Sequence, residues 1–408
     1  MQDNEKKPAL RFKGFTDPWE QRKLTNLCEK FTDGDWIEAK DQSDSGVRLV
    51  QTGNVGVTEY LDKPNNKKWI SFETFEQLHC EEVYPGDILI SRLPEPAGRA
   101  CIMPNLGTKM ITAVDCTIVR PNAVTSTRFL LQYLSSQAYF DAVNTCLAGG
   151  TRQRISRGNL AQFNVPIPSS KIEQEKIGEV LEKLDTLITL HQRKYEKLVN
   201  IKKSMLDKMF PKNGASVPEI RFKGFTDPWE QRKVGTLIED YTEKTVTQNQ
   251  YPVLTSSQQQ GIVLQEDYFA DRQVTTDNNV GYYVLPKGYF TYRSRSDTDV
   301  FVFNRNNIVD KGIISYYYPV FAPKSCDSNF LLRRLNHGIK KQLSMAAEGT
   351  GQKVLAHAKF KNMVVDVPSQ SEQEKIGTIL EELDTLITLH QREHIKPILE
   401  VKRVKRNE

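Results

Sequence analysis

Arginine side chains gather in two stretches of the sequence that contain no acidic residue: residues 149–168, where they occur with Gln153 and Asn159, and residues 285–296, where they occur with Lys287 and three aromatic residues. Arginine can pair with guanine through two hydrogen bonds, glutamine and asparagine can pair in the same way with adenine, and lysine neutralises phosphate. Both stretches therefore carry chemistry suited to duplex DNA, with a solvated loop as the alternative for each. The predicted DNA contacts are Gln51, Thr52, Asn54, Arg92, Thr151, Arg152, Gln153, Arg154, Arg157, Ser256, Ser257, Gln258, Arg293, Arg295, Thr350, Gln352 and Lys353.

The sequence lacks the motifs on which common catalytic sites depend. Residues 349–353, Gly-Thr-Gly-Gln-Lys, resemble a phosphate-binding loop but lack its Gly-Lys-Ser/Thr end. There is no Asn/Asp-Pro-Pro-aromatic tetrapeptide for amino-methylation of a flipped base, and neither a GxSxG nor an HExxH motif occurs. Six cysteines without a CxxC pair support neither a zinc site nor a disulfide framework. We therefore expect a chain that is not an enzyme and that holds no cofactor or metal.

Length and composition predict a globular protein of several domains. A single core seldom exceeds about 250–300 residues, so 408 residues indicate two or three domains. Hydrophobic residues make up 38% of the sequence and charged residues 26%, which excludes a wholly disordered chain. No apolar run approaches the roughly 18–20 residues of a membrane span, so we expect a cytoplasmic protein without a membrane partner. The formal net charge of +5 permits a polyanionic partner without requiring one.

Two sequence blocks occur twice in the chain. Residues 11–23 and 221–233 are identical, both reading RFKGFTDPWEQRK. Residues 173–193, EQEKIGEVLEKLDTLITLHQR, return at residues 372–392 with only three substitutions. The chain is therefore a tandem duplication of one unit, which consists of a short block, a long middle region and a helical block.

The two middle regions, residues 24–172 and 234–371, have diverged while the blocks around them have not. They share only short anchors, such as Phe-Leu-Leu at residues 129–131 and 330–332. Short β-like runs alternate with turn signals in both regions, and helical stretches are expected at 129–147 and 330–347. The β-like runs are 47–51, 87–91, 116–120, 282–285, 289–293 and 313–320. We predict an α/β (α+β) fold in each region, one fold that carries two different surfaces.

The helical blocks predict two long helices that pair through an apolar seam. Apolar or neutral residues recur at alternating steps of three and four, which is the spacing of a coiled-coil seam. The first helix should cover residues 171–210 and the second residues 371–396, because Pro397 removes a donor and clashes with the preceding turn. The predicted seam consists of Ile177, Leu181, Leu184, Ile188, His191, Tyr195, Leu198, Ile376, Leu380, Leu383, Ile387 and His390.

The duplication predicts that the two helices lie antiparallel and that the two globular domains are related by pseudo-twofold symmetry. A first domain at residues 1–170 would precede the central helix at 171–210, and a second domain at 211–370 would precede the C-terminal helix at 371–396. The basic tail, residues 397–408, should be frayed and solvated. For the two seam histidines, interhelical packing is preferred over a metal site.

These repeated blocks resemble those of the DNA-specificity subunit of type I restriction-modification systems, of the kind found in Gram-positive bacteria. Further stretches that carry the resemblance are LVQTGNVG at 49–56, PGDILISR at 85–92 and YPVLTSSQQQGIVLQEDYF at 251–269. The resemblance covers essentially the whole chain. It implies two target-recognition domains that each read one half of a split double-stranded DNA sequence, held apart by two helices that act as a ruler.

The resemblance also implies partners. Two methyltransferase subunits would dock on the helices, and restriction subunits with translocase and nuclease activity would join them. S-adenosylmethionine, ATP and magnesium would then act on those subunits and not on this chain. One departure concerns the end of the second helical block, which changes after Arg392 to EHIKPILEVKRVKRNE and puts normal docking around it in doubt. The alternatives are a coiled-coil scaffold that binds proteins and, less favoured, a self-contained DNA methyltransferase.

Overall fold

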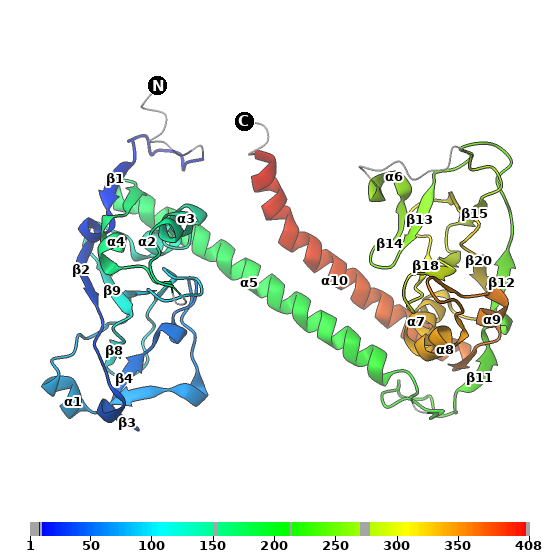
Figure 1. Cartoon of the computed structure of the whole chain (residues 1–408), viewed down its shortest axis with the longest axis horizontal. Helices are drawn as coiled ribbons and strands as arrows, with labels where there is room; N and C mark the ends of the chain where they lie inside the picture. Colours follow the sequence, from blue (N-terminus) through cyan, green and yellow to red (C-terminus); the bar gives the residue numbers. More distant parts are fainter. Residues whose placement is uncertain (1–7, 9, 151–152, 213, 270–277, 405–408) are drawn as a thin grey trace. The chain divides into compact units, whose positions relative to one another are not determined.

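The computed structural model describes residues 8, 10–150, 153–212, 214–269 and 278–404, with side chains up to Gln391 (Figure 1). The chain divides into two compact units, Met1–Thr189 and Leu190–Glu408. The division falls inside the long helix α5 (Lys171–Lys208). Each unit therefore contains part of this helix.

The first unit contains two four-stranded sheets and a helical layer. One sheet has the order β2-β9-β6-β7 and is antiparallel, and the other has the order β3-β5-β4-β8 with β4 and β8 parallel. The main apolar core lies between the first sheet and helices α2 to α4. The elements are β2 (Cys28–Asp33), β3 (Gln42–Ser43), β4 (Val47–Val50), β5 (Lys68–Ile70), α1 (Phe72–Gln77), β6 (Ile88–Ser91), β7 (Ala100–Ile102), β8 (Met110–Thr112), β9 (Cys116–Pro121), α2 (Thr127–Tyr133), α3 (Gln137–Thr145) and α4 (Arg157–Gln162).

The second unit repeats the first sheet and replaces the second one. Its four-stranded sheet has the order β12-β20-β16-β18. As in β2-β9-β6-β7, the first strand along the chain lies at one edge and pairs with the last, which pairs in turn with the second of the four. Instead of a second four-stranded sheet, the described part of the second unit has the separate strand pairs β13–β14, β15–β19 and β17–β21. The elements are β12 (Ile238–Tyr241), β13 (Leu254–Ser257), β14 (Gly261–Leu264), α6 (Gln265–Tyr268), β15 (Tyr283–Pro286), β16 (Phe290–Tyr292), β17 (Arg295–Ser296), β18 (Phe303–Arg305), β19 (Lys311–Ile314), β20 (Val320–Pro323), α7 (Ser328–Gly338), α8 (Lys340–Ala346), β21 (Lys353–Val354) and α9 (His357–Lys361).

The prediction of one fold in both regions is confirmed by this shared strand order, and most predicted strands are found. The run predicted at 313–320 is wrong as a single strand, because it consists of the end of β19, a turn and the beginning of β20. The helices predicted at 129–147 and 330–347 are each split in two. In the first unit the split occurs at Ser136, whose hydroxyl caps α3 by accepting a hydrogen bond from the Tyr139 amide.

The repeated blocks build the same frame in both units. The strand formed by Glu-Gln-Arg-Lys pairs antiparallel with the strand that precedes the long helix, in the same register: β1 (Glu20–Lys23) with β10 (Asn164–Ile167), and β11 (Glu230–Lys233) with β22 (Val364–Val367). The first arginine of each block binds the first glutamate of the long helix that follows in the same unit. These bidentate pairs, Arg11–Glu173 and Arg221–Glu372, have N–O distances of 2.7 to 2.8 Å, and both glutamates are 1% exposed.

Helix α10 (Gln370–Val404) is longer than predicted. The expected stop before Pro397 is wrong, because the helix runs through this proline to Val404 and includes part of the segment predicted as a solvated tail. A proline within a helix removes one backbone hydrogen bond and kinks or weakens the helix without necessarily ending it. Helix α5 ends at Lys208, close to its predicted end.

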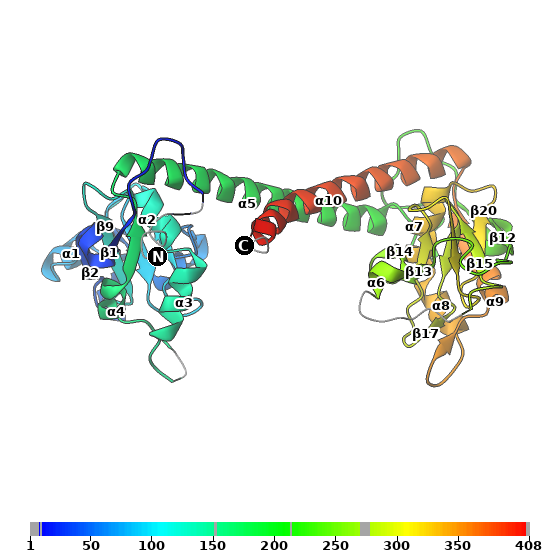
Figure 2. The ribbon, with the colours of Figure 1, turned by 90° about the horizontal axis from the view of Figure 1, so that it is seen from above.

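Within the second unit, the distal part of α5 packs antiparallel against α10. Leu198, Met205 and Leu206 contact the core that contains Ile376 and Leu380. Helix α7 lies along the first part of α10 (Figure 2). None of the helices in the described ranges is both long and apolar enough to cross a membrane.

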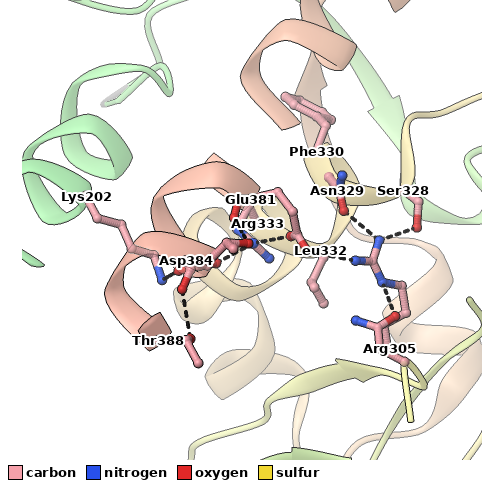
Figure 3. A network of polar contacts seen from close by, with 12 residues as sticks. Lys202, Arg305, Ser328, Asn329, Phe330, Leu332, Arg333, Glu381, Asp384 and Thr388 are labelled. Atoms are coloured by element: carbon pink, nitrogen blue, oxygen red, sulfur yellow. Dashed lines mark hydrogen bonds and ion pairs between the residues drawn. The ribbon is translucent and has the colours of Figure 1, made fainter. Parts of the chain in front are cut away.

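One carboxylate joins all three of these helices. Asp384 of α10 pairs with Lys202 of α5 and with Arg333 of α7 (Figure 3). The repeated position in the first unit, Asp185, accepts a hydrogen bond from Gln132 of α2 at 2.8 Å. The helix residue is thus constant, while each globular region supplies its own partner.

A repeated glycine allows the helices to approach closely. A Cβ atom at Gly377 would lie 2.3 Å from Asp327 Oδ1 and 3.0 Å from the Phe330 amide nitrogen, at the beginning of α7. We predict that Gly377→Ala lowers the free energy of unfolding by about 1–2 kcal/mol, since overpacking outweighs the better helix propensity of alanine. Chemical denaturation can measure this. The control is Thr378→Ala at the exposed neighbouring position, which should be neutral or stabilising; equal effects would refute the packing argument.

Candidate nucleic-acid interface

In the first unit, three predicted arginines meet at two aspartates. Asp33 lies 3.5 Å from Arg92 Nε and 3.8 Å from Arg157 Nε. Asp115 lies 3.7 Å from Arg92 Nη2 and 3.6 Å from Arg154 Nη1. The side chain of Arg92 is 11% exposed, whereas those of Arg154 and Arg157 are 61% and 46% exposed. We call these five residues the arginine cluster.

The three arginines of the arginine cluster differ in their exposure, and therefore in what they can bind. Arg92 also donates to the Val114 carbonyl at 2.6 Å, so its guanidinium supports the loops and has little surface for a ligand. Arg154 and Arg157 are held from one side by the aspartates and remain open to solvent. Three cations against two carboxylates leave the cluster with a positive excess, which suits a phosphate contact.

The stretch Gln51–Asn54 serves a structural purpose in part. Asn54 is 2% exposed, and its side chain accepts from the Gln51 amide at 3.0 Å and donates to the Leu61 carbonyl at 2.9 Å. Arg99 donates to the Thr52 carbonyl at 2.8 Å. A buried side chain whose amide oxygen and amide nitrogen both bind within the fold cannot read a base, so the position of Asn54 argues against its predicted role. Gln51 and Thr52 are half-buried.

The remaining predicted residues of the first unit lie on the connection between α3 and α4. Gln153 is exposed. Thr151 and Arg152 lie outside the described residues. The backbone that follows is anchored, because Ala148 and Arg154 exchange two hydrogen bonds of 2.9 and 3.0 Å.

In the second unit, a cavity of about 730 Å³ collects most of the predicted residues. It opens between the β13–β14 hairpin, the segment around β17 and the residues that follow β19. The predicted residues among its walls are Ser256, Ser257, Gln258, Arg293, Arg295 and Gln352. The sequence placed them in three separate stretches, and the fold brings them together.

Aromatic and amide groups fix the arginine side of this cavity. The guanidinium of Arg295 lies 4.2 Å from the ring centroid of Tyr317. The Tyr316 hydroxyl donates to the Tyr317 hydroxyl at 3.0 Å, and this hydrogen bond raises the pKa of Tyr316. Gln352 Nε2 donates to Asp297 Oδ1 at 3.0 Å, which leaves its carbonyl oxygen as an acceptor.

The hairpin side of the cavity is held by Asn304 of β18. Its Nδ2 atom donates to Ser256 Oγ and to the Ser257 carbonyl, both at 2.8 Å. Ser257 Oγ accepts from the amides of Gln259 and Gln260 at 3.2 Å. Ser256 and Ser257 therefore shape the hairpin, while Gln258 at its tip is exposed and donates to the Val300 carbonyl at 3.3 Å.

Arg293 is the most available cation of the second unit's cavity. It is exposed and makes no ion pair with any described residue. Lys353 lies in β21, where it pairs with Ser296 of β17. Thr350 is exposed in the turn before β21 and does not line the cavity.

The residues of the predicted helix seam differ in burial along the two helices. Ile376, Leu380, Leu383 and His390 of α10 are at most 9% exposed. Ile387, Tyr195 and Leu198 are half-buried, and Ile177 packs against the core of the first unit. In contrast, Leu181, Leu184 and Ile188, in the part of α5 that belongs to the first unit, are 37%, 47% and 38% exposed. The side chains of the last turns of α10 lie outside the described residues.

The two seam histidines meet across the helix pair. His191 Nδ1 and His390 Nδ1 are 3.4 Å apart, which confirms the predicted interhelical contact. Within the described ranges, no three histidine, cysteine, aspartate or glutamate side chains lie together as a metal site would require.

Several residues that build these sites were not predicted from the sequence. Asp33 and Asp115 organise the arginine cluster from positions remote in the chain, and no spacing signals such a pairing. Gln265, Tyr268 and Tyr317 line the cavity. The aromatic residues that alternate with arginine in the sequence, Tyr289, Phe290 and Tyr292, do not line the cavity.

Comparisons with known proteins agree with this description. The family model for the type I restriction modification DNA specificity domain matches residues 16–200 and, a second time, residues 227–399. A protein of Methanocaldococcus jannaschii, assigned as the MjaX type I restriction enzyme specificity subunit, is 20% identical over 398 residues, which cover 92% of this chain and 89% of that protein.

One solved structure shares the fold over nearly the whole chain. It is the S subunit of a type I restriction-modification system from M. genitalium, with a TM-score of 0.58, 13% sequence identity, and coverage of 98% of this chain and 97% of that chain. At this identity the likeness concerns the fold alone. The two matches to one family model fall on the two copies of the duplicated unit.

Proposed function

The chain belongs to the type I restriction-modification DNA specificity family, and we infer from this that it is the non-catalytic subunit that directs methylation and restriction to a bipartite DNA sequence. It is a specificity subunit with two target-recognition domains. We propose that residues 24–172 read one half-site and residues 234–371 read the other.

The observation that carries this proposal is the contrast between frame and surface. Both units share a strand pair, a buried Arg–Glu pair and a long helix, whereas their polar surfaces differ. The first offers the arginine cluster, and the second offers a cavity with amide and aromatic walls. Different surfaces on equal frames are what two unlike half-sites would require.

In the proposed binding mode, some side chains attract the DNA backbone and others recognise the bases. Arg154, Arg157 and Arg293 would neutralise phosphates without regard to sequence, and amide groups such as those of Gln153 and Gln258 would reach base edges. Two recognition domains on one face of B-DNA would lie about one helical turn, roughly 34 Å, apart. Helices α5 and α10 would set this distance, with the two units in pseudo-twofold relation.

The finer parts of the proposal concern partners and setting. Two methyltransferase subunits would dock on α5 and α10, and restriction subunits would join that core. S-adenosylmethionine, ATP and magnesium would be bound by those subunits. We also propose a cytoplasmic location, a Gram-positive type of system and domain boundaries near residues 170, 210 and 370.

An exchange of one recognition domain tests the proposal. Residues 24–172 are replaced by the corresponding region of another specificity subunit, and modified adenines are mapped by genome sequencing. We expect one half-site to change while the other half-site and the spacer length stay the same. The matched control replaces residues 234–371 and should change the opposite half. A change in both halves after a single exchange would contradict the division of labour.

A further inference from the structure

The cavity of the second unit is larger than contact with an intact duplex requires. Major-groove reading is done by a protruding helix or β-ribbon that enters the groove. A hollow of about 730 Å³ instead has the size of a small-molecule site. Resting on the proposed function, we propose that this cavity receives one base turned out of the DNA stack in the half-site that the second unit reads.

Aromatic side chains form walls on which a base can stack. Tyr268 and Phe269 come from α6 and the residue after it, and Tyr317 follows β19. Arg295 adds the plane of its guanidinium, which already lies on Tyr317. Bases that have left the duplex are commonly stacked between aromatic rings and arginine planes. The cavity therefore offers the surroundings that replace lost base stacking.

A buried acceptor in the wall points to the edge of a base. Gln265 Oε1 is shielded from solvent and has no hydrogen-bond partner among the described residues. Leaving such an atom without a donor is unfavourable, so a ligand with an N–H group would be held there. The Gln352 carbonyl oxygen is a second acceptor, because its Nε2 atom already binds Asp297. Two acceptors favour a base with an exocyclic amino group, and disfavour thymine.

The positive charge at the rim of the cavity suits the phosphate groups beside the turned-out base. Arg293 is exposed and pairs with no carboxylate among the described residues. Two arginines and one aspartate line the cavity, which leaves a positive excess. Arg293 would bind the phosphate next to the turned-out base, while the amides hold the base itself.

The experiment removes, one position at a time, the base opposite each nucleotide of the second half-site and measures binding by the complex assembled with the full chain. Turning out a base costs less when its pairing partner is missing. We expect about tenfold tighter binding at one position. Gln265→Leu should abolish this gain, and so should Tyr268→Ala, a change at a partly exposed position. Gln260→Ala is the control, because Gln260 lies beside the cavity without lining it.

The outcomes separate this inference from the proposed function. If the complex with the unsubstituted chain showed no sequence-specific binding, the proposed function would be refuted. Specific binding without a gain at any position would refute only the turned-out base. A gain that persists in both cavity variants, with their thermal unfolding unchanged, would assign the base to another subunit and overturn the inference.

Discussion

Replacing Arg293 and Arg295 together by alanine is expected to weaken binding to a duplex with the full bipartite site about 100-fold. Each arginine contact with DNA contributes roughly 1–3 kcal/mol, and 1.4 kcal/mol corresponds to a factor of ten. The loss should be confined to the second half-site, so discrimination at the first half-site stays unchanged. Fluorescence anisotropy with duplexes altered in either half measures both effects.

The folding of the variant should be nearly unaffected. Neither arginine makes an ion pair among the described residues, and the contact of Arg295 with Tyr317 contributes about 0.5–1 kcal/mol. Arg293→Ala alone should reduce the slope of log affinity against log salt by about one, as expected for one phosphate contact.

A charge-matched control separates local contact from net charge. Lys287→Ala combined with Lys324→Ala removes two exposed cations of the same unit outside the cavity. These substitutions should weaken binding only a few-fold. Equal losses from both pairs of substitutions would mean that the cavity arginines act through overall charge and do not contact the site.

The contrast between Arg293 and Asn54 shows where sequence reasoning succeeds and where it fails. Both are polar residues predicted to contact DNA, and the sequence gives no sign of which one faces solvent. Asn54 is enclosed because the Leu61 carbonyl, the Gln51 amide and Arg99 surround its turn. Such contacts depend on tertiary placement, which residue type and spacing do not report.

The frame was more predictable than the sites. Helix α5 and strands such as β4, β6 and β16 follow from apolar periodicity and turn signals, which are local properties. The duplication predicted that both units share a core sheet, and they do. The path of α10 through Pro397 was not predicted, because one lost hydrogen bond is a smaller penalty than the stop rule assumes.

The candidate sites depend on contacts between distant segments. The arginine cluster needs Asp33 and Asp115, and the cavity needs the hairpin after Leu254 to approach the residues around Tyr317. The duplication narrowed the search to the diverged regions, since residues that differ between two equal frames are candidates for different targets. It could not say which of those residues meet in space.

Glu372→Ala is expected to lower the free energy of unfolding of the second unit by about 3–5 kcal/mol. Removing one partner of a buried ion pair leaves the other charge without compensation. Arg221 is 11% exposed, and its Nη1 atom has no hydrogen-bond partner among the described residues. For a unit of this size the loss corresponds to a fall of about 10 °C in unfolding temperature. Calorimetry can measure this, and hydrogen exchange can assign it to the second unit.

The design separates the ion pair from the helix that carries it. Glu374→Ala changes an exposed glutamate two residues after Glu372 in the same helix. The only described side-chain contact of Glu374 is with Gln370, so its loss should cost less than about 0.5 kcal/mol. The double change Arg221→Met with Glu372→Leu should recover part of the loss, because it leaves no buried charge unpaired. If Glu374→Ala proved as harmful as Glu372→Ala, helix propensity would explain the effect and the repeated Arg–Glu pair would not hold the frame together.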